Sequence, residues 1–298
     1  MDILSEITDH KRIEVELQKQ AVSPEQLREQ VRDLMENSPA PRRSMKRALA
    51  SSPAGIIAEF KRRSPSKGWI YKTAKADEIP AAYEAAGASA ISILTDEKFF
   101  GGSLRDIRTA RPLVDIPILR KDFIIDEYQL LQAHIAGADA VLLIAACLTQ
   151  EECADLTAQA HALGLEVLLE IHSPRELAYI SKDVDMVGVN NRNLGTFVTD
   201  VENSFRIAGQ LRQTIAGVRN ISDARNVPDA QDSSDPPRNL PLLVSESGIS
   251  HPETICRLRT AGFRGFLIGE TFMKTPQPGD ALKGFIQGIE ETEAQKSL

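Results

Sequence analysis

The stretch "IAGADAVLLI", residues 135–144, decides the fold, because it passes from the end of a helix into a buried strand within a few residues. Gly137 stands where the helix would end, and a glycine there can take the left-handed conformation that closes the last turn. The apolar run that follows, 138–144, is typical of a strand that is buried on both faces. The same join recurs as "AAGASA" at 85–90 and as "TAGFRG" at 260–265. The repeat predicts a chain in which helices and strands alternate.

Eight short apolar runs fit this alternation. They lie at 54–60, 88–94, 116–121, 138–144, 165–171, 184–190, 240–246 and 263–269. Amphipathic helical stretches lie between them. Eight such units in 298 residues predict an α/β fold of the (β/α)8 TIM barrel type. A doubly wound open sheet is the alternative, but no GxGxxG motif follows a strand, and the count of eight favours the barrel.

Two segments fall outside this alternation of helices and strands. Residues 1–50 read as helices, with Ser23 as an N-cap and Pro24 at the first helical position. We interpret them as an N-terminal helical extension that packs on a catalytic barrel of residues 51–298. Residues 216–241 are polar and rich in Asp, Asn, Ser and Pro, which predicts a long loop before the seventh strand.

The composition is that of an ordinary globular protein, with 42% hydrophobic and 26% charged residues. A net charge of −7 argues against bulk attraction to nucleic acid or to an anionic membrane. The three cysteines form no CxxC pair, which fits a reducing compartment. No apolar run reaches transmembrane length, and the charged N-terminus is not a secretory signal. We therefore expect a cytoplasmic protein with no nucleic-acid or membrane partner.

Polar side chains stand at the C-terminal ends of six predicted strands, where barrel enzymes carry out their chemistry. They are Glu59, Lys61, Lys121, Glu170, Asn190, Arg192, Glu246, Ser247 and Glu270. A single buried charge is most simply a structural ion pair, but each further one adds a desolvation cost that structure alone does not explain. The set therefore predicts an active site whose groups donate and accept protons.

Glycines follow the seventh and eighth predicted strands, in "SESG" at 245–248 and "LIGE" at 267–270. Backbone N–H groups can approach an anion at such positions, and phosphate sites in this fold lie after these two strands. Lys61 and the serines that begin at Ser64 would close the same site from the first strand, which neighbours the eighth in a closed barrel. The two arginines that follow Lys61 cannot both face inward, so at least one is expected to be a solvent-exposed charge.

Other catalytic patterns are missing from the sequence. There is no GxSxG elbow and no Walker loop, and the five histidines lack metal-ligand spacing, so no metal is predicted. His172 follows the fifth predicted strand closely enough to approach the rim, but we favour a loop position for it. Cys147 reads as a small buried hydrophobe rather than a nucleophile.

Eight motifs, in order along the chain, closely resemble the indole-3-glycerol-phosphate synthase family. They are "AEFKRRSPSKG", "ISILTDEKFFGGS", "PILRKDFIIDEYQ", "ADAVLLIAA", "LLEIHS", "VGVNNRNLGTF", "VSESGI" and "FLIGETFM". The resemblance covers nearly the whole chain, including the extension, which in this family folds over the barrel mouth. It implies a carboxy-lyase of tryptophan biosynthesis that closes the indole ring of 1-(2-carboxyphenylamino)-1-deoxyribulose 5-phosphate. Carbon dioxide and water leave, and no metal or organic cofactor is used.

The resemblance also implies roles for individual residues. Lys121 matches the general acid that protonates the substrate carbonyl oxygen, and Lys61 the second catalytic lysine. Glu59 and Glu170 match the acid–base carboxylates, in an order that the sequence leaves open, and Asn190 matches a residue that holds them. The implied substrate- and phosphate-binding residues are Ser64, Phe123, Leu142, Arg192, Glu246, Ser247, Gly248, Gly269 and Glu270.

Two stretches depart from the family pattern. "WIYKTAKADEI" at 69–79 lacks the aspartate-rich motif of many relatives, and 216–241 is longer than expected. Two alternatives remain: a barrel similar to phosphoribosylanthranilate isomerase, which would need a Cys/Asp pair, and a non-catalytic phosphate-binding barrel. The expected partner is a small phosphorylated substrate, and the expected state is a monomer or a weak homo-oligomer.

Overall fold

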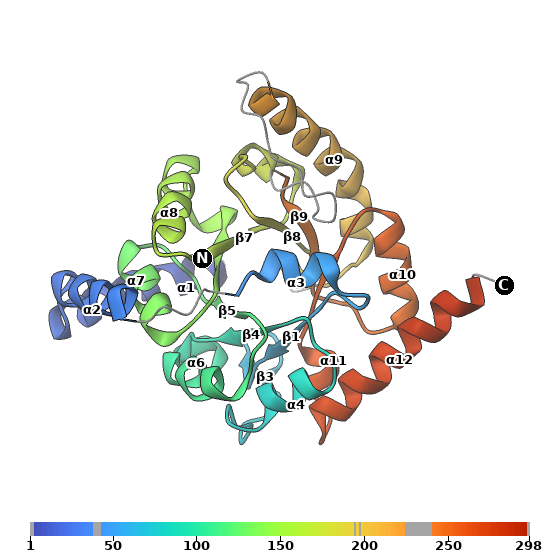
Figure 1. Cartoon of the computed structure of the whole chain (residues 1–298), viewed down its shortest axis with the longest axis horizontal. Helices are drawn as coiled ribbons and strands as arrows, with labels where there is room; N and C mark the ends of the chain where they lie inside the picture. The colour runs from blue at the N-terminus through green and yellow to red at the C-terminus, as the bar shows by residue number, and fades with distance from the viewer. Residues whose placement is uncertain (1–2, 38–42, 194, 197, 224–239, 297–298) are drawn as a thin grey trace.

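The structure is a computed structural model that describes residues 3–37, 43–193, 195–196, 198–223 and 240–296. Eight parallel strands in these ranges close into a barrel (Figure 1). They are β1 (Ile56–Phe60), β4 (Ala90–Leu94), β5 (Ile118–Lys121), β6 (Ala140–Ile144), β7 (Glu166–Ile171), β8 (Met186–Asn190), β9 (Leu242–Glu246) and β10 (Gly265–Ile268). Around the barrel the order is β1-β10-β9-β8-β7-β6-β5-β4, and β1 pairs with both β10 and β4. Each strand lies within its predicted range, so the barrel is confirmed and the open sheet is wrong.

Helices form a ring around the strands (Figure 1). The longer ones are α4 (Ile79–Ala85), α6 (Leu104–Ala110), α7 (Glu127–Ala136), α8 (Gln150–Ala162), α9 (Glu202–Asp223), α10 (Pro252–Thr260) and α12 (Pro278–Lys296). Short helical turns are α5 (Glu97–Phe100), α11 (Glu270–Met273), η1 (Arg111–Leu113), η2 (Ala145–Cys147) and η3 (Pro174–Tyr179). Gly137 caps α7 with a φ of 90°, and its N–H donates to Ala133 O and His134 O. The join that the opening stretch predicts is therefore present.

Alternate residues of each strand point into the barrel, as the period of two requires. Ile57, Leu119, Leu168 and Val244 pack together in the barrel interior. Two residues further along the same four strands stand Glu59, Lys121, Glu170 and Glu246. The period that builds the apolar core thus also turns charged side chains inward at the C-terminal end of the barrel.

The N-terminal extension contacts both ends of the barrel. It consists of α1 (Ile3–Ala21), α2 (Pro24–Asn37) and α3 (Met45–Ser51). Helices α1 and α2 pack on α7 through Val15, Leu27 and Val31. Met45 and Leu49 of α3 insert into the apolar interior at the opposite, N-terminal end, and α3 crosses the ring of strands in Figure 1. The division of the chain at residue 50 stays a prediction.

A buried lysine holds α1 on the catalytic end of the barrel. Lys11 is 1% exposed, and its Nζ lies 2.9 Å from Asp96 Oδ2, 3.0 Å from Asp122 Oδ1 and 3.0 Å from Glu14 Oε2. Asp96 follows β4 and Asp122 follows β5, directly after Lys121. The helix is therefore fastened by charge to two strand ends that border the cavity described below.

The prediction of a loop that begins at 216 is wrong for residues 216–223, which belong to α9. The buried residues Ile207, Leu211 and Ile215 recur every fourth position, and a helix once formed extends at little cost into polar residues. Residues 224–239 of the predicted loop lie outside the described residues. In the part of the chain that the structure describes, no helix combines the length and the apolar character needed to cross a lipid bilayer.

Candidate active site

A cavity of about 630 Å³ opens at the C-terminal ends of the barrel strands. Its size is typical of a site for a small molecule. All predicted site residues except Glu246 line it: Glu59, Lys61, Ser64, Lys121, Phe123, Leu142, Glu170, Asn190, Arg192, Ser247, Gly248, Gly269 and Glu270. Ile3, Leu4 and Ile7 of α1 also line it. The extension therefore covers the mouth of the barrel, as the family resemblance implies.

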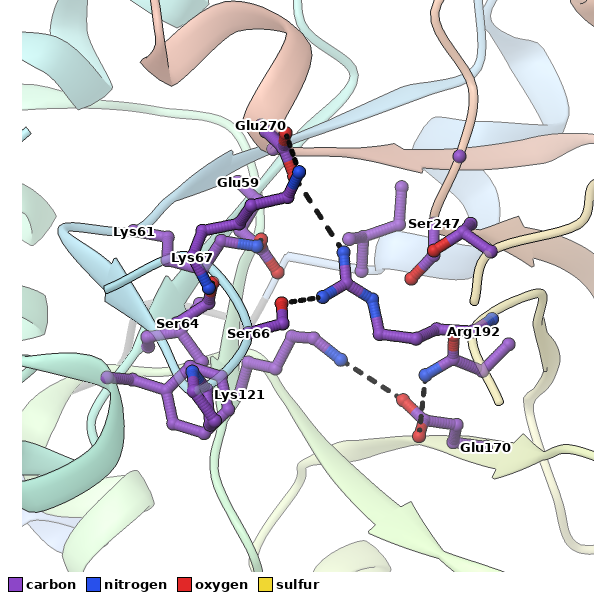
Figure 2. A pocket seen from close by; sticks show the side chains of 18 of the residues that line it. Glu59, Lys61, Ser64, Ser66, Lys67, Lys121, Glu170, Arg192, Ser247 and Glu270 are labelled. Atoms are coloured by element: carbon purple, nitrogen blue, oxygen red, sulfur yellow. Dashed lines mark hydrogen bonds and ion pairs between the residues drawn. The ribbon is translucent and has the colours of Figure 1, made fainter. Parts of the chain in front are cut away.

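Lys121, at the end of β5, carries its ammonium group among three carboxylates. Its Nζ lies 3.1 Å from Glu170 Oε2, a contact drawn in Figure 2, and 3.3 Å from Glu246 Oε2. Burial disfavours the charge, but the carboxylates of Glu170, Glu246 and Glu59 outweigh burial and raise the pKa of Lys121. Lys121 is therefore a cation at neutral pH. From the sequence alone the net shift is undecided, because a second lysine on the rim lowers this pKa while nearby carboxylates raise it.

Glu170, on β7, is held on both of its carboxylate oxygens. Oε2 faces Lys121, while Oε1 accepts a hydrogen bond from Asn190 Nδ2 at 3.1 Å and lies 3.2 Å from His172 Nε2. Burial alone would raise the pKa of Glu170, but Lys121 and then His172 and Asn190 lower it well below its usual range. Glu170 is thus an ionised carboxylate with a fixed orientation.

Glu246, on β9, lies beneath the cavity rather than in its lining. It is 1% exposed, and burial raises its pKa to about 7 although Lys121 opposes the shift. Its carboxylate rests against Gly188 of β8, where a Cβ would come within 2.0 Å of Glu246 Oε1. Glu246 therefore contacts Lys121 from below. A binding role for Glu246 requires contact through another group, because the residue itself does not line the cavity.

A second lysine–carboxylate pair lies across the barrel from the first. Lys61 Nζ is 2.5 Å from Glu59 Oε1. Glu59 lies in β1, and Lys61 follows directly after the strand. In the closed strand order β1 stands opposite β7, which carries Glu170. Glu59 therefore faces Glu170 across the cavity, while Lys121 on β5 is separated from β1 only by β4.

The remaining polar lining forms one end of the cavity. Arg192 Nη1 donates to Ser66 Oγ at 2.6 Å, and Arg192 Nη2 lies 3.8 Å from Glu270 Oε2 (Figure 2). Ser247 and Gly248 follow β9 with φ values of 68° and 79°, so two successive residues are left-handed. Strained residues of this kind cluster at binding sites, and turns that align successive backbone N–H groups bind anions. This end of the cavity suits a phosphate.

The two arginines beside Lys61 do not line the cavity. Arg62 Nη1 lies 2.6 Å from Asp106 Oδ2, and its guanidinium stacks over Phe60. Arg63 lies over the ring of Trp69, in a small hairpin of β2 (Arg63–Ser64) and β3 (Gly68–Trp69) that the sequence analysis missed. Both arginines are only partly exposed, so neither is the free surface charge that was expected. Of the three basic residues 61–63, Lys61 therefore lines the cavity and the two arginines do not.

Sequence reasoning missed several groups of the site. Ile3, Leu4 and Ile7 line the cavity, but their apolar stripe gave no sign of contact with a substrate rather than with a core. Lys11 gave no signal, because a lysine in a helix normally faces solvent. His172 could have been found, since it stands two residues after Glu170 and shares its inward face.

The chain is a closed (β/α)8 barrel. Its cavity contains two ammonium–carboxylate pairs and an end that suits a phosphate, which together define a barrel enzyme of the acid–base class. The family described as "Indole-3-glycerol phosphate synthase" matches residues 4–234. An indole-3-glycerol phosphate synthase of Bacteroides thetaiotaomicron is 66% identical over 97% of this chain and 99% of its own length. Another, of Magnetococcus marinus, is 39% identical over 95% of this chain and 97% of its own.

Solved structures of a tryptophan synthase alpha-subunit from Pyrococcus furiosus share the fold. One of them superposes with a TM-score of 0.55 at 14% identity, over 80% of this chain and 98% of its own. That identity supports the barrel and nothing more specific. The sequence matches decide the family: the chain belongs to the indole-3-glycerol phosphate synthases, which are carboxy-lyases of tryptophan biosynthesis.

Proposed function

We propose that this chain closes the indole ring of 1-(2-carboxyphenylamino)-1-deoxyribulose 5-phosphate through two lysine–glutamate pairs, with Lys121 as the general acid of ring closure. The observation that carries the proposal is the position of Lys121, whose ammonium faces the cavity between Glu170 and Glu246. Family membership sets the activity. The proposal concerns which side chains perform it.

In ring closure the ring carbon that bears the carboxylate attacks the substrate carbonyl carbon. The electrons of the carbonyl double bond move to its oxygen, which takes the proton from Lys121. Carbon dioxide then leaves, and its bonding electrons return to the aromatic ring. A cation fixed by carboxylates stabilises the developing oxyanion without reorganisation, which is where preorganised charge contributes most.

Once Lys121 has given up its proton, Glu170 loses the cation that kept its pKa low. Its carboxylate becomes a stronger base at that moment and can accept a proton or return one to Lys121. The dehydration that follows needs one donor and one acceptor. We assign Lys61 and Glu59 on the facing wall to these two roles, because their charged groups are already in contact.

The substrate phosphate is proposed to bind at the end of the cavity formed by Arg192, Ser64 and the Ser247–Gly248 turn, with the backbone of Gly269 and Glu270. A guanidinium and aligned N–H groups suit a phosphate dianion. The aromatic ring would lie against Phe123 and Leu142, which line the same cavity. Asn190 is assigned to hold Glu170, to which it already donates.

Two other functions are less well supported. An isomerase of the cysteine–aspartate type needs a cysteine in the site, and the described lining of the cavity includes none. A non-catalytic phosphate-binding barrel would not account for Lys121, Glu170 and Glu246. These side chains lie away from the phosphate end, and burying their charges costs free energy.

We also propose a cytoplasmic location and a monomeric or weakly self-associating state. The three cysteines, all within the described chain, form no disulfide, which fits a reducing compartment. Sedimentation analysis at increasing protein concentration tests the oligomeric part. A dimer that persists at nanomolar concentration would contradict it.

The catalytic proposal is tested by adding the carboxyphenylamino-deoxyribulose phosphate to the purified protein and recording indole fluorescence. New fluorescence in proportion to enzyme supports the proposal. Binding of the substrate without an indole signal would favour the non-catalytic barrel.

A further inference from the structure

His172 contacts the carboxylate of Glu170 from outside the lining of the cavity. Its Nε2 lies 3.2 Å from Glu170 Oε1, and its Nδ1 lies 3.8 Å from Glu176 Oε2. The His172 side chain is 12% exposed, and it is not part of the cavity lining. It can therefore act on the reaction only through Glu170.

The position of His172 is fixed from three sides. Glu176, in η3, accepts the backbone N–H of His172 at 2.5 Å and that of Ser173 at 3.4 Å. Asn203, in α9, donates to the backbone carbonyl of His172 at 3.3 Å. Strand β7 supplies Glu170 itself. These contacts fix the backbone of His172, and its ring then lies between the carboxylates of Glu170 and Glu176.

We propose that His172 is a positioning residue whose ring contacts Glu170 Oε1, so that Oε2 stays on Lys121. The inference rests on the proposed function, in which Lys121 and Glu170 exchange a proton. It adds a charge, backed by Glu176, to the group formed by Lys121, Glu170 and Glu246.

The charges around His172 agree with this role. Glu170 faces it from β7 and Glu176 from η3, while α9 contributes only the neutral Asn203. Burial would lower the pKa of His172, but the two carboxylates outweigh it and raise the pKa to about 9. The side chain is therefore a cation at neutral pH. Without it, Glu170 Oε1 would keep only the amide of Asn190, and the carboxylate would bind protons more readily.

The test compares the full chain with His172→Gln, which keeps a donor but removes the charge. We expect roughly a tenfold fall in kcat near pH 7, since the close contact between charged groups is lost, with KM changed far less. The wild-type pH profile of kcat should show a partial decrease near pH 9, where His172 loses its proton, and the variant should lack that decrease. The acid limb of the variant should move to higher pH. Glu176→Gln should shift the decrease near pH 9 downward.

His161→Gln is the matched control. His161 Nε2 lies 2.8 Å from Asp185 Oδ2, so it forms the same kind of pair, but Asp185 precedes β8 at the opposite end of the barrel. This variant should keep the wild-type pH profile. A second readout needs no turnover: the imidazole NMR signal of His172 should titrate near pH 9, and at lower pH in Glu170→Gln.

The outcomes separate the two claims. An inactive wild-type protein would overturn the proposed function, while the NMR titration would still report on the His172–Glu170 pair. An active wild type whose kcat and pH profile are unchanged by His172→Gln would overturn the positioning role alone. A fall in kcat with an unchanged pH profile, matched by a loss of thermal stability, would also overturn it, because that result describes a structural residue.

Discussion

Gly269 leaves the space that the carboxylate of Glu59 occupies: a Cβ at Gly269 would lie 2.3 Å from Glu59 Oε1. The sequence analysis explained this glycine by the approach of an anion to its backbone. The structure adds a second reason, which is the room that Glu59 needs to reach Lys61. Gly188 does the same for Glu246.

Gly269→Ala should therefore disable the Glu59–Lys61 pair. The backbone φ at this position is −120°, which alanine tolerates, so the added methyl acts mainly by displacing Glu59. We expect a fall in kcat of roughly tenfold or more, as for a lost bond between charged groups. Steady-state kinetics measures it. Gly284→Ala in α12, where an added Cβ meets nothing within 4 Å, should keep the wild-type kcat.

Lys61→Ala should lower kcat, because Lys61 is assigned to the dehydration step with Glu59. It should also weaken inhibition by inorganic phosphate and raise KM, because its ammonium lines the same cavity as Ser64. A charge-assisted contact contributes about 1.5–3 kcal/mol, so the inhibition constant should rise by roughly tenfold or more. Lys72→Ala is the control, because Lys72 is exposed over Trp69 and does not line the cavity. Unchanged phosphate inhibition in Lys61→Ala would mean that Arg192 and the backbone around Gly248 and Gly269 bind the anion without Lys61.

Lys11→Met should destabilise the protein by about 3 kcal/mol or more, because Asp96 would keep a buried charge without this cation and Asp122 would keep only Arg120. Urea unfolding at pH 7 measures this loss. Lys11 and Arg120 lower the pKa of Asp122, although burial opposes them. The stability that Asp122 contributes is therefore full above the ordinary aspartate pKa and is lost as pH falls below it.

The effect of Lys11→Met should accordingly shrink at low pH. Arg12→Met is the control, since Arg12 pairs with Asp9 on the exposed side of α1 and should leave the unfolding curve unchanged. Equal curves for the wild type and Lys11→Met would show that α1 is held by its apolar contacts alone.

Glu246→Gln should make the protein more stable at pH 8 while reducing activity. The pKa of Glu246 in the folded state, about 7, lies above its unfolded value, so the folded protein binds more protons between these values. Wild-type stability from this residue is full below the unfolded pKa and falls as pH rises through about 7. A neutral glutamine does not ionise, so the variant keeps its stability as the pH rises. Thermal unfolding at pH 4.5 and pH 8 should show the advantage only at pH 8; an advantage of equal size at both would contradict the shifted pKa.

Much of the fold could be predicted because its signals are local. The glycine in "IAGADA" ends a helix whatever lies around it, and all eight strands were found from short apolar runs. The C-terminal ends of the predicted strands then located Lys121 and Glu170 at one rim of the barrel. The extent of α9 was missed because polar residues at the end of a helix resemble a loop, and only burial of the preceding turns distinguishes them.

The site was predicted less completely, because its missing parts depend on contacts between distant segments. Lys11 is buried only because Asp96 and Asp122 lie under it, more than eighty residues away in the chain. Ile7 lines the cavity only because α1 is fastened there. His172 follows its predicted strand and therefore reads as a loop residue. Its spacing of two residues from Glu170 is the signal that would have placed it on the same face.

The central claim is that Lys121 supplies the proton for ring closure, and the kcat of Lys121→Ala tests it most directly. Indole fluorescence after addition of the carboxyphenylamino-deoxyribulose phosphate gives that rate, and binding of a phosphate-bearing product gives a control for the fold of the site. We predict a fall in kcat of at least roughly 10²–10⁴-fold, typical of an acid–base group, with far less change in product affinity. A variant that keeps a kcat near the wild-type value would contradict the account and remove Lys121 from the mechanism.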